Sequence, residues 1–149
     1  MRNLILFFLL FSQCFTMLTA QEGGGDKDFL YDFIAGTYEI LGKAQDTTYL
    51  YSGKITFQKH QSRFKVIREI NDTKIIGIGF IEKATGDNVP VLRIYFKENK
   101  IEYAATYILG SDLDNYARLS GYLYTVNNET VNPGLETLFF IKPTQNIPD

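Results

Sequence analysis

The sequence predicts an all-β protein, an eight-stranded antiparallel up-and-down barrel with a short N-terminal helical turn. After Gly36, apolar and polar residues alternate with a period of two, which is typical of strands with one buried face. The chain contains 12 Phe and 10 Tyr, and aromatic residues suit a half-buried pleated surface. The predicted connections are too short for parallel crossovers, so neighbouring strands are antiparallel. Closing such a sheet into a barrel removes its exposed edges.

Residues 1–20 are predicted to be a signal peptide. Arg2 precedes the unbroken apolar run Leu4–Phe11, and Ala20 stands before the polar residue Gln21. The apolar run is shorter than the roughly 20 residues that cross a bilayer. We therefore expect no stable membrane insertion and a secreted or periplasmic mature protein.

Cys14 allows a second interpretation of the leader, because a bacterial lipoprotein is cleaved before a cysteine that follows an apolar run. Gln13 is bulky where a small residue is usual, and the residues after Cys14 are apolar rather than tether-like. A lipoprotein anchored at Cys14 is therefore the less favoured alternative. Cleavage after residue 20 removes the only cysteine, so the mature chain is expected to have no disulfide.

The predicted organisation is one domain. Residues 21–35 form a leader with a helical turn at Asp28–Ile34, residues 36–143 form the barrel, and residues 144–149 form a tail. With 15 Lys+Arg, 17 Asp+Glu and no basic stripe, the chain is not expected to bind nucleic acid. The predicted strands are Thr37–Leu41, Tyr49–Lys59, Arg63–Ile70, Thr73–Glu82, Val89–Lys97, Lys100–Leu109, Tyr116–Thr125 and Leu135–Lys142.

Alternation also predicts which side chains face the interior. A one-residue shift of Arg63–Ile70 would bury Lys65 and Glu69 and expose three apolar residues, so Arg68 is predicted to point inward. Thr73–Glu82 is apolar on both faces, and we interpret Ile76, Ile78 and Phe80 as inward, with the outer face covered by the N-terminal turn. Other residues predicted to face inward are Tyr51, Gly53, Ile55, Phe57, Phe64, Val66, Ile70, Ile101, Tyr103, Ala105, Tyr107, Leu119, Gly121 and Leu123.

The segment Gly36-Thr37-Tyr38 resembles the opening of the lipocalin and avidin superfamily, the calycins, in which the aromatic residue is normally Trp. The chain as a whole resembles a group of small exported bacterial calycin-like proteins, mostly without assigned function. The blocks that carry this resemblance are Tyr51–Phe57, Phe64–Val66, Ile76–Gly79, Leu119–Gly121 and Gly134–Leu138. The resemblance implies a short barrel with one open mouth and an interior that can hold a cavity, but it implies no particular ligand.

The residues predict no catalytic, metal or cofactor site. His60 is the only histidine and lies in a polar hairpin, so we interpret it as a solvated turn residue. The mature chain lacks the further His or Cys ligands of a usual zinc site, and it has no nucleophile elbow or phosphate loop. Asp112 and Asp114 are interpreted as turn residues rather than calcium ligands. Asn71 and Asn128 are interpreted in the same way rather than as glycosylation sites.

Two charged residues, Arg68 and Glu136, are predicted inside the barrel, Glu136 because it alternates with Leu138 and Phe140. A buried charge needs a partner, and Arg does not neutralise. The favoured interpretation is an Arg68–Glu136 ion pair. The alternative is that Arg68 anchors the head group of an acidic amphipathic ligand.

The sequence thus predicts an exported non-enzymatic protein that holds a small apolar or amphipathic ligand in its barrel. The alternative is a structural or surface-interaction protein with a filled barrel that contacts a macromolecule through its loops and outer face. An enzyme, such as an isomerase working by shape, ranks third. Large inward rings favour filling, whereas small inward residues favour some room. The predicted ligand-binding residues are Arg68, Tyr51, Tyr103, Tyr107 and Glu136, and the outer tyrosines are Tyr116, Tyr122 and Tyr124.

Overall fold

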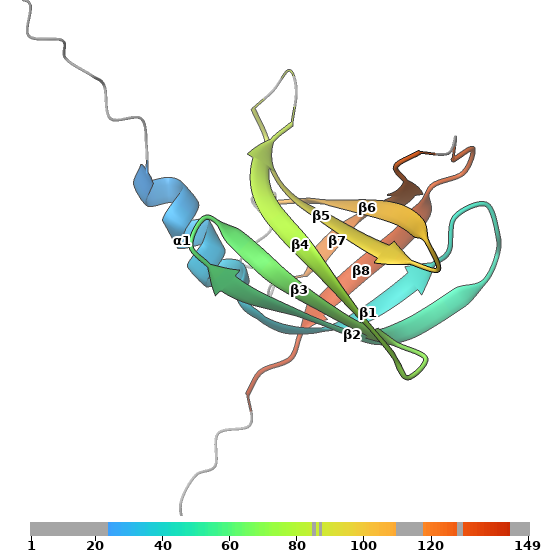
Figure 1. Ribbon diagram of the computed structural model, residues 1–149. Helices are drawn as coiled ribbons and strands as arrows, with labels where there is room; N and C mark the ends of the chain where they lie inside the picture. The colour runs from blue at the N-terminus through green and yellow to red at the C-terminus, as the bar shows by residue number, and fades with distance from the viewer. Residues whose placement is uncertain (1–23, 85, 87, 110–117, 128–129, 144–149) are drawn as a thin grey trace, which may run out of the picture.

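The computed structural model describes residues 24–84, 86, 88–109, 118–127 and 130–143 of the chain (Figure 1). The predicted signal peptide with Cys14, the residues Asp112, Asp114, Tyr116 and Asn128, and the predicted tail lie outside the described residues. The elements are α1 (Gly24–Ile34), β1 (Gly36–Lys43), β2 (Leu50–His60), β3 (Arg63–Ile70), β4 (Thr73–Lys83), β5 (Pro90–Glu98), β6 (Ile101–Ile108), β7 (Leu119–Thr125) and β8 (Gly134–Phe140).

The eight strands form one closed barrel in chain order, each antiparallel to the next, and β8 pairs with β1 to complete it. Figure 1 shows the strands wrapping around a common interior, with α1 beside one end of the barrel. The predicted fold class is confirmed. Closure matters here because every strand has a hydrogen-bonded neighbour on both sides, so no edge is left unpaired.

Two hairpins at the end away from α1 have tight two-residue turns. Asn71 and Asp72 join β3 to β4 with φ angles of 50° and 59°, and Asn99 and Lys100 join β5 to β6 with φ angles of 48° and 69°. Positive φ at both central positions is the signature of a type I′ turn, whose twist matches that of the flanking strands. The predicted strands Val89–Lys97 and Lys100–Leu109 leave Glu98 and Asn99 as the turn. In the structure the turn lies one residue later, and Glu98 is the last residue of β5.

The interior consists of the side chains that alternation placed inward on β2, β3, β7 and β8. On β6 the predicted phase is also correct, but Ile101 lies at the strand end and is exposed. Side chains fill the half of the barrel near α1, where aromatic rings meet edge to face, as between Phe57 and Phe64 with centroids 5.6 Å apart. Fully buried members of this core are Tyr38, Ile40, Ile55, Phe57, Phe64, Val66, Leu92, Ile94, Leu119 and Leu138.

The phase predicted for β4 is wrong. Its inward residues are Ile75, Gly77, Gly79 and Ile81, whereas Ile76 is 52% exposed. The pairing with β3 decides this, because residues opposite one another on neighbouring strands share a face. Gly79 lies opposite Phe64 and Gly77 opposite Val66, so the glycines provide the space that the large β3 and β5 side chains occupy.

Helix α1 closes one end of the barrel. The prediction that the N-terminal turn covers the outer face of β4 is therefore wrong. The Tyr31 hydroxyl donates to the Ser62 carbonyl at 2.6 Å and accepts from the Ile81 amide at 3.0 Å. The Tyr31 ring packs on Phe64, with centroids 4.8 Å apart, and Ile34 is buried. The helix is longer than the predicted turn, since it begins at Gly24 and has 11 residues.

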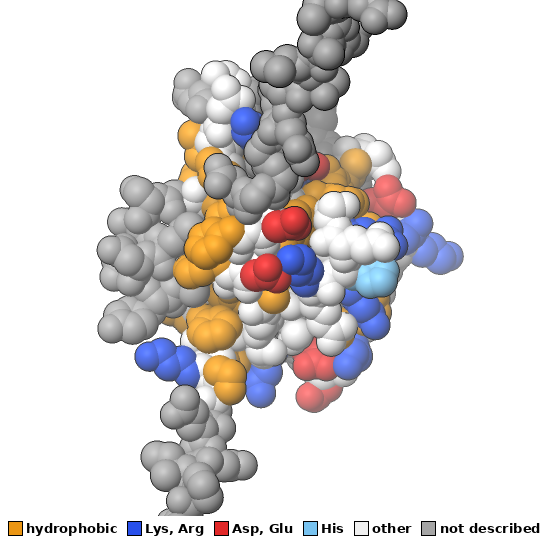
Figure 2. All heavy atoms as spheres, turned by 90° about the vertical axis from the view of Figure 1, so that its left-hand side faces the viewer, with side chains coloured by type: hydrophobic (Ala, Val, Ile, Leu, Met, Phe, Trp, Pro, Cys, Tyr) orange, Lys and Arg blue, Asp and Glu red, His pale blue; other side chains and the backbone are white. Residues whose placement is uncertain are grey.

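The outer side of α1 is partly hydrophobic. Phe29 and Phe33 are exposed, and their ring centroids lie 6.0 Å apart. Figure 2 shows the face of the molecule to which α1 belongs, with hydrophobic side chains gathered along one side and charged side chains in the centre and on the other side. Within the described residues, no helix is long and apolar enough to cross a membrane.

The phase of β4 can be tested with two neighbouring substitutions that both keep a β-branched side chain. Ile75→Thr should lower the free energy of unfolding by about 1–3 kcal/mol, because it removes buried apolar atoms and buries a hydroxyl. Ile76→Thr should change it by no more than about 0.5 kcal/mol, because that side chain faces solvent. Urea unfolding of both variants measures the difference, and the reverse order would contradict the observed register.

Candidate functional site

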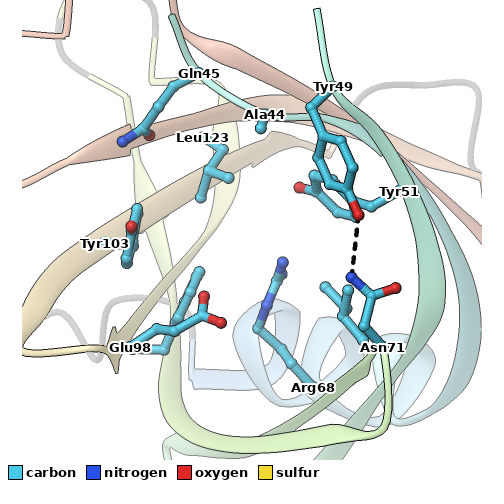
Figure 3. A pocket seen from close by; sticks show the side chains of 11 residues that line it. Ala44, Gln45, Tyr49, Tyr51, Arg68, Asn71, Glu98, Tyr103 and Leu123 are labelled. Carbon is cyan, nitrogen blue, oxygen red and sulfur yellow. Dashed lines mark hydrogen bonds between the residues drawn. The ribbon is translucent and has the colours of Figure 1, made fainter. Parts of the chain in front are cut away.

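The open end of the barrel, opposite α1, contains a cavity of about 330 Å³ (Figure 3). The β1–β2 connection and the β3–β4 and β5–β6 hairpins surround it. It reaches inward as far as Arg68, which is only 2% exposed. Its lining residues are Ala44, Gln45, Tyr49, Tyr51, Arg68, Ile70, Asn71, Phe96, Glu98, Tyr103 and Leu123.

A row of five paired residues forms part of the layer below the cavity. Gly42 of β1 lies between Tyr51 of β2 and Glu136 of β8, and Gly121 of β7 lies between Glu136 and Tyr107 of β6. A Cβ atom at Gly42 would fall on the Tyr51 ring, and one at Gly121 would lie 2.8 Å from Cδ1 of Tyr107. The two glycines therefore let the tyrosine rings lean across the sheet toward Glu136 from both sides.

Glu136 accepts hydrogen bonds from three side chains. The Tyr51 hydroxyl donates to Oε1 and the Tyr107 hydroxyl donates to Oε2. From β3, Arg68 Nη2 donates to Oε1 at 2.6 Å and Nη1 donates to Oε2 at 3.2 Å. This is the bidentate arrangement in which guanidinium and carboxylate bind most strongly. The carboxylate has no exposed surface, so the four donated hydrogen bonds take the place of water.

Arg68 makes one further contact and has one unused donor. Its Cζ lies 4.4 Å from the centre of the Phe96 ring, a cation–π distance. Its Nε is buried and has no hydrogen-bond partner among the described residues, and the same holds for Oε1 of Gln45. Buried polar atoms in proteins usually have a partner. These two atoms, a donor and an acceptor, belong to residues that line the same cavity.

The network shifts the pKa values of its members. Burial raises the pKa of Glu136, but the Arg68 charge and the hydrogen bonds from Arg68, Tyr107 and Tyr51 outweigh it, so the net pKa lies below the ordinary 4.5. Burial lowers the pKa of Arg68, and the Glu136 carboxylate more than reverses this effect. Burial, followed by the nearby carboxylate, raises the pKa values of Tyr51 and Tyr107. At neutral pH the group is an ion pair with two neutral phenols.

Four aromatic side chains line the walls of the cavity. Phe96 and Tyr103 are stacked, with centroids 5.3 Å apart and an angle of 13° between the rings. Figure 3 shows Tyr49 and Tyr51 across the cavity from Tyr103. Asn71 of the β3–β4 turn donates to the Tyr49 hydroxyl at 3.2 Å, which ties two sides of the rim together. The result is a small chamber with aromatic walls and Arg68 at its inner end.

The structure brings four of the five predicted site residues into one network. Arg68, Tyr51, Tyr107 and Glu136 are in direct contact, whereas Tyr103 lies nearer the mouth. The favoured prediction of an Arg68–Glu136 ion pair matches the structure. Tyr107 and Glu136 are buried beneath the cavity and are not among its lining residues.

Sequence reasoning missed several lining residues. Glu98 and Phe96 continue the inward alternation of Leu92 and Ile94 on β5, so that pattern could have identified them. Tyr49 begins the predicted strand Tyr49–Lys59 and shares the phase of Tyr51, so alternation could have identified it as well. Gln45 lies in a strand connection, where alternation makes no prediction. His60 ends β2 at the opposite end from the cavity and is exposed, as expected for a turn residue. Among the described residues, no cluster of three or more His, Cys, Asp or Glu side chains could hold a metal ion.

No protein-family model matches the chain, and no curated protein matches it significantly. The fold and the geometry of the site are therefore the basis for assigning a function.

The ion pair can be tested by removing its charges singly and together. Arg68→Met should lower the free energy of unfolding by about 3–5 kcal/mol, because it leaves the Glu136 carboxylate buried without its counter-charge. The double variant Arg68→Met/Glu136→Gln should recover most of this loss, since the neutral Gln amide can accept from one tyrosine hydroxyl through its oxygen and donate to the other through its nitrogen. Urea unfolding of the wild type, Arg68→Met, Glu136→Gln and the double variant measures the coupling between the two charges. An Arg68→Met variant as stable as the wild type would contradict the structural role of the pair.

Acid should weaken the same network. The folded pKa of Glu136 is lower than its ordinary value of 4.5, so its contribution to stability is fully present above that pH. The contribution is lost as the pH falls through the folded pKa. The difference in unfolding free energy between wild type and Glu136→Gln should therefore shrink as the pH is lowered from neutral to about 3. A difference that stays constant over this range would show that Glu136 does not titrate below its ordinary pKa.

Proposed function

We propose that the exported, mature form of this protein binds a small amphipathic molecule in the cavity at the open end of its barrel. The observation that carries this proposal is the cavity itself, about 330 Å³ in volume, which ends on a fully buried ion-pair network. This volume is at the small end of the range typical of ligand pockets, roughly 300–1,000 Å³. It suits a compact molecule and not a long lipid chain.

The lining supports an amphipathic ligand. Phe96, Tyr103 and Leu123 offer apolar surface, while Gln45 and Tyr51 place polar atoms on the same chamber. Small-molecule sites typically combine apolar surface with placed polar groups, and this lining offers both. The unpartnered acceptor of Gln45 is a polar atom that a ligand can satisfy.

Binding, rather than catalysis, is the function that this arrangement favours. A general base needs a free lone pair within reach of the substrate. Each of the two carboxylate oxygens of Glu136 already accepts two hydrogen bonds, and the carboxylate is completely buried. Both terminal nitrogens of Arg68 donate hydrogen bonds to this carboxylate. The network therefore supports a structural role for these charges below a binding chamber.

The proposal predicts that the protein purified from its own host carries a small molecule. Native mass spectrometry of the wild type should show an additional mass that organic solvent removes. Tyr103→Ala should lower its occupancy, with affinity falling roughly tenfold, because the variant removes one ring of the stacked wall.

Tyr122→Ala is the matched control, because Tyr122 is 52% exposed on the outer face of β7. It should keep the wild-type occupancy. An equal loss in both variants, or no additional mass in the wild type, would contradict binding in the cavity. A wild type without bound mass that captures a macromolecule through Tyr122 would instead support the surface-interaction alternative.

A further inference from the structure

The charge of the cavity is set by a single side chain. Two charged residues of the described chain line it, Arg68 and Glu98. The charge of Arg68 is matched by Glu136 directly behind it, at 2.6 Å. The pair is therefore neutral as a unit, which leaves the carboxylate of Glu98 as the uncompensated charge of the lining.

Glu98 is free to act on a ligand. It is the last residue of β5 and shares the inward face with Ile94 and Phe96. Within the part of the chain that the structure describes, it forms no ion pair. The nearby basic residue Lys97 faces the opposite side of the strand and pairs with Glu102 at 3.4 Å. The basic residue next to Glu98 on β5 is therefore engaged outside the barrel, and Lys100 of the adjoining turn is exposed and forms no ion pair with Glu98 among the described residues.

Figure 3 shows the Glu98 carboxylate turned toward the cavity, in the view between Arg68 and Tyr103. The electrostatics agree with this position. Partial burial raises the pKa of Tyr103, and the negative charge of Glu98 adds to the increase. The carboxylate thus acts on the same space that the aromatic wall encloses.

The aromatic lining also favours a positively charged ligand. Tyr49, Tyr51, Phe96 and Tyr103 line the chamber from both sides. The face of an aromatic ring is electron-rich and attracts cations, and this attraction grows when the cation is shielded from water. One such contact already exists in the chamber, between Arg68 and Phe96.

We propose that the ligand is a small organic cation, an amine or ammonium compound with an apolar group, whose charged nitrogen binds near Glu98 among the tyrosines. This inference rests on the proposed function, since it names the ligand class of the same cavity. The apolar group packs toward Leu123 and the Phe96–Tyr103 wall. An acidic ligand gains less here, because it meets the Glu98 carboxylate and because both terminal nitrogens of Arg68 are already bound to Glu136.

Three probes of similar shape test the sign of the charge: 2-phenylethylamine, 2-phenylethanol and phenylacetate. Isothermal titration calorimetry of the mature protein at low salt should give an affinity for the amine about tenfold higher than for the alcohol. Phenylacetate should bind most weakly. Added salt should reduce the advantage of the amine and leave the alcohol unchanged, because salt screens the partly exposed carboxylate.

Glu98→Gln should abolish the preference for the amine while leaving the affinity for 2-phenylethanol unchanged. Glu102→Gln is the matched control, because it removes the same charge from the outer side of the same hairpin, and it should retain the preference. Thermal unfolding of both variants confirms that they are folded.

The outcomes separate this inference from the function on which it rests. Equal affinity for the three probes, tighter binding of phenylacetate, or an amine preference that survives in Glu98→Gln would overturn the cation proposal while leaving binding in the cavity intact. Absence of binding by all three probes would also overturn it. The mass-spectrometric comparison of Tyr103→Ala with Tyr122→Ala then judges the proposed function separately.

Discussion

The rest of the structure depends on the need to satisfy a carboxylate that the barrel removes completely from water. Glu136 sits at the middle of the interior on β8, and isolated burial of its charge would cost several kcal/mol. Strands on both sides of β8 contribute to its solvation, because Tyr51 and Tyr107 reach it over the glycines of the intervening strands. Arg68 supplies the counter-charge from β3. The Glu136 side chain therefore links four strands of the barrel, β2, β3, β6 and β8, and a fifth, β5, packs Phe96 against the guanidinium.

Such a network need not be more stable than an apolar core of the same volume. Its physical effect is on register. A shift of β8 by one residue would turn Glu136 out of the barrel and leave Arg68 buried alone, so misaligned pairings are strongly disfavoured. The network also divides the interior. On one side, apolar side chains and α1 fill the barrel. On the other side, the chain leaves a chamber whose inner end is polar but neutral.

This division explains how a barrel rich in large aromatic residues can still hold a cavity. The rings near α1 interlock, as with Tyr31, Phe57 and Phe64. Near the mouth, Phe96 and Tyr103 stack against each other and line the chamber instead of filling it. Because the buried ion pair cancels its own charge, a carboxylate at the rim decides the electrostatic character of the chamber. The buried network and the uncompensated charge of the chamber are thus provided by different residues.

The sequence alone determined the eight strands and the inward position of Arg68 and Glu136, which follow from period-two alternation, and the antiparallel order, which follows from the short connections. It failed where alternation carries no information. β4 is apolar on both faces, so only its pairing with β3 sets Ile75 inward and Ile76 outward. The close approach of Tyr51 to Glu136 over Gly42 depends on the register of three strands. The cavity depends on how rings from distant strands pack together, and local periodicity cannot specify that packing because it involves residues far apart in the chain.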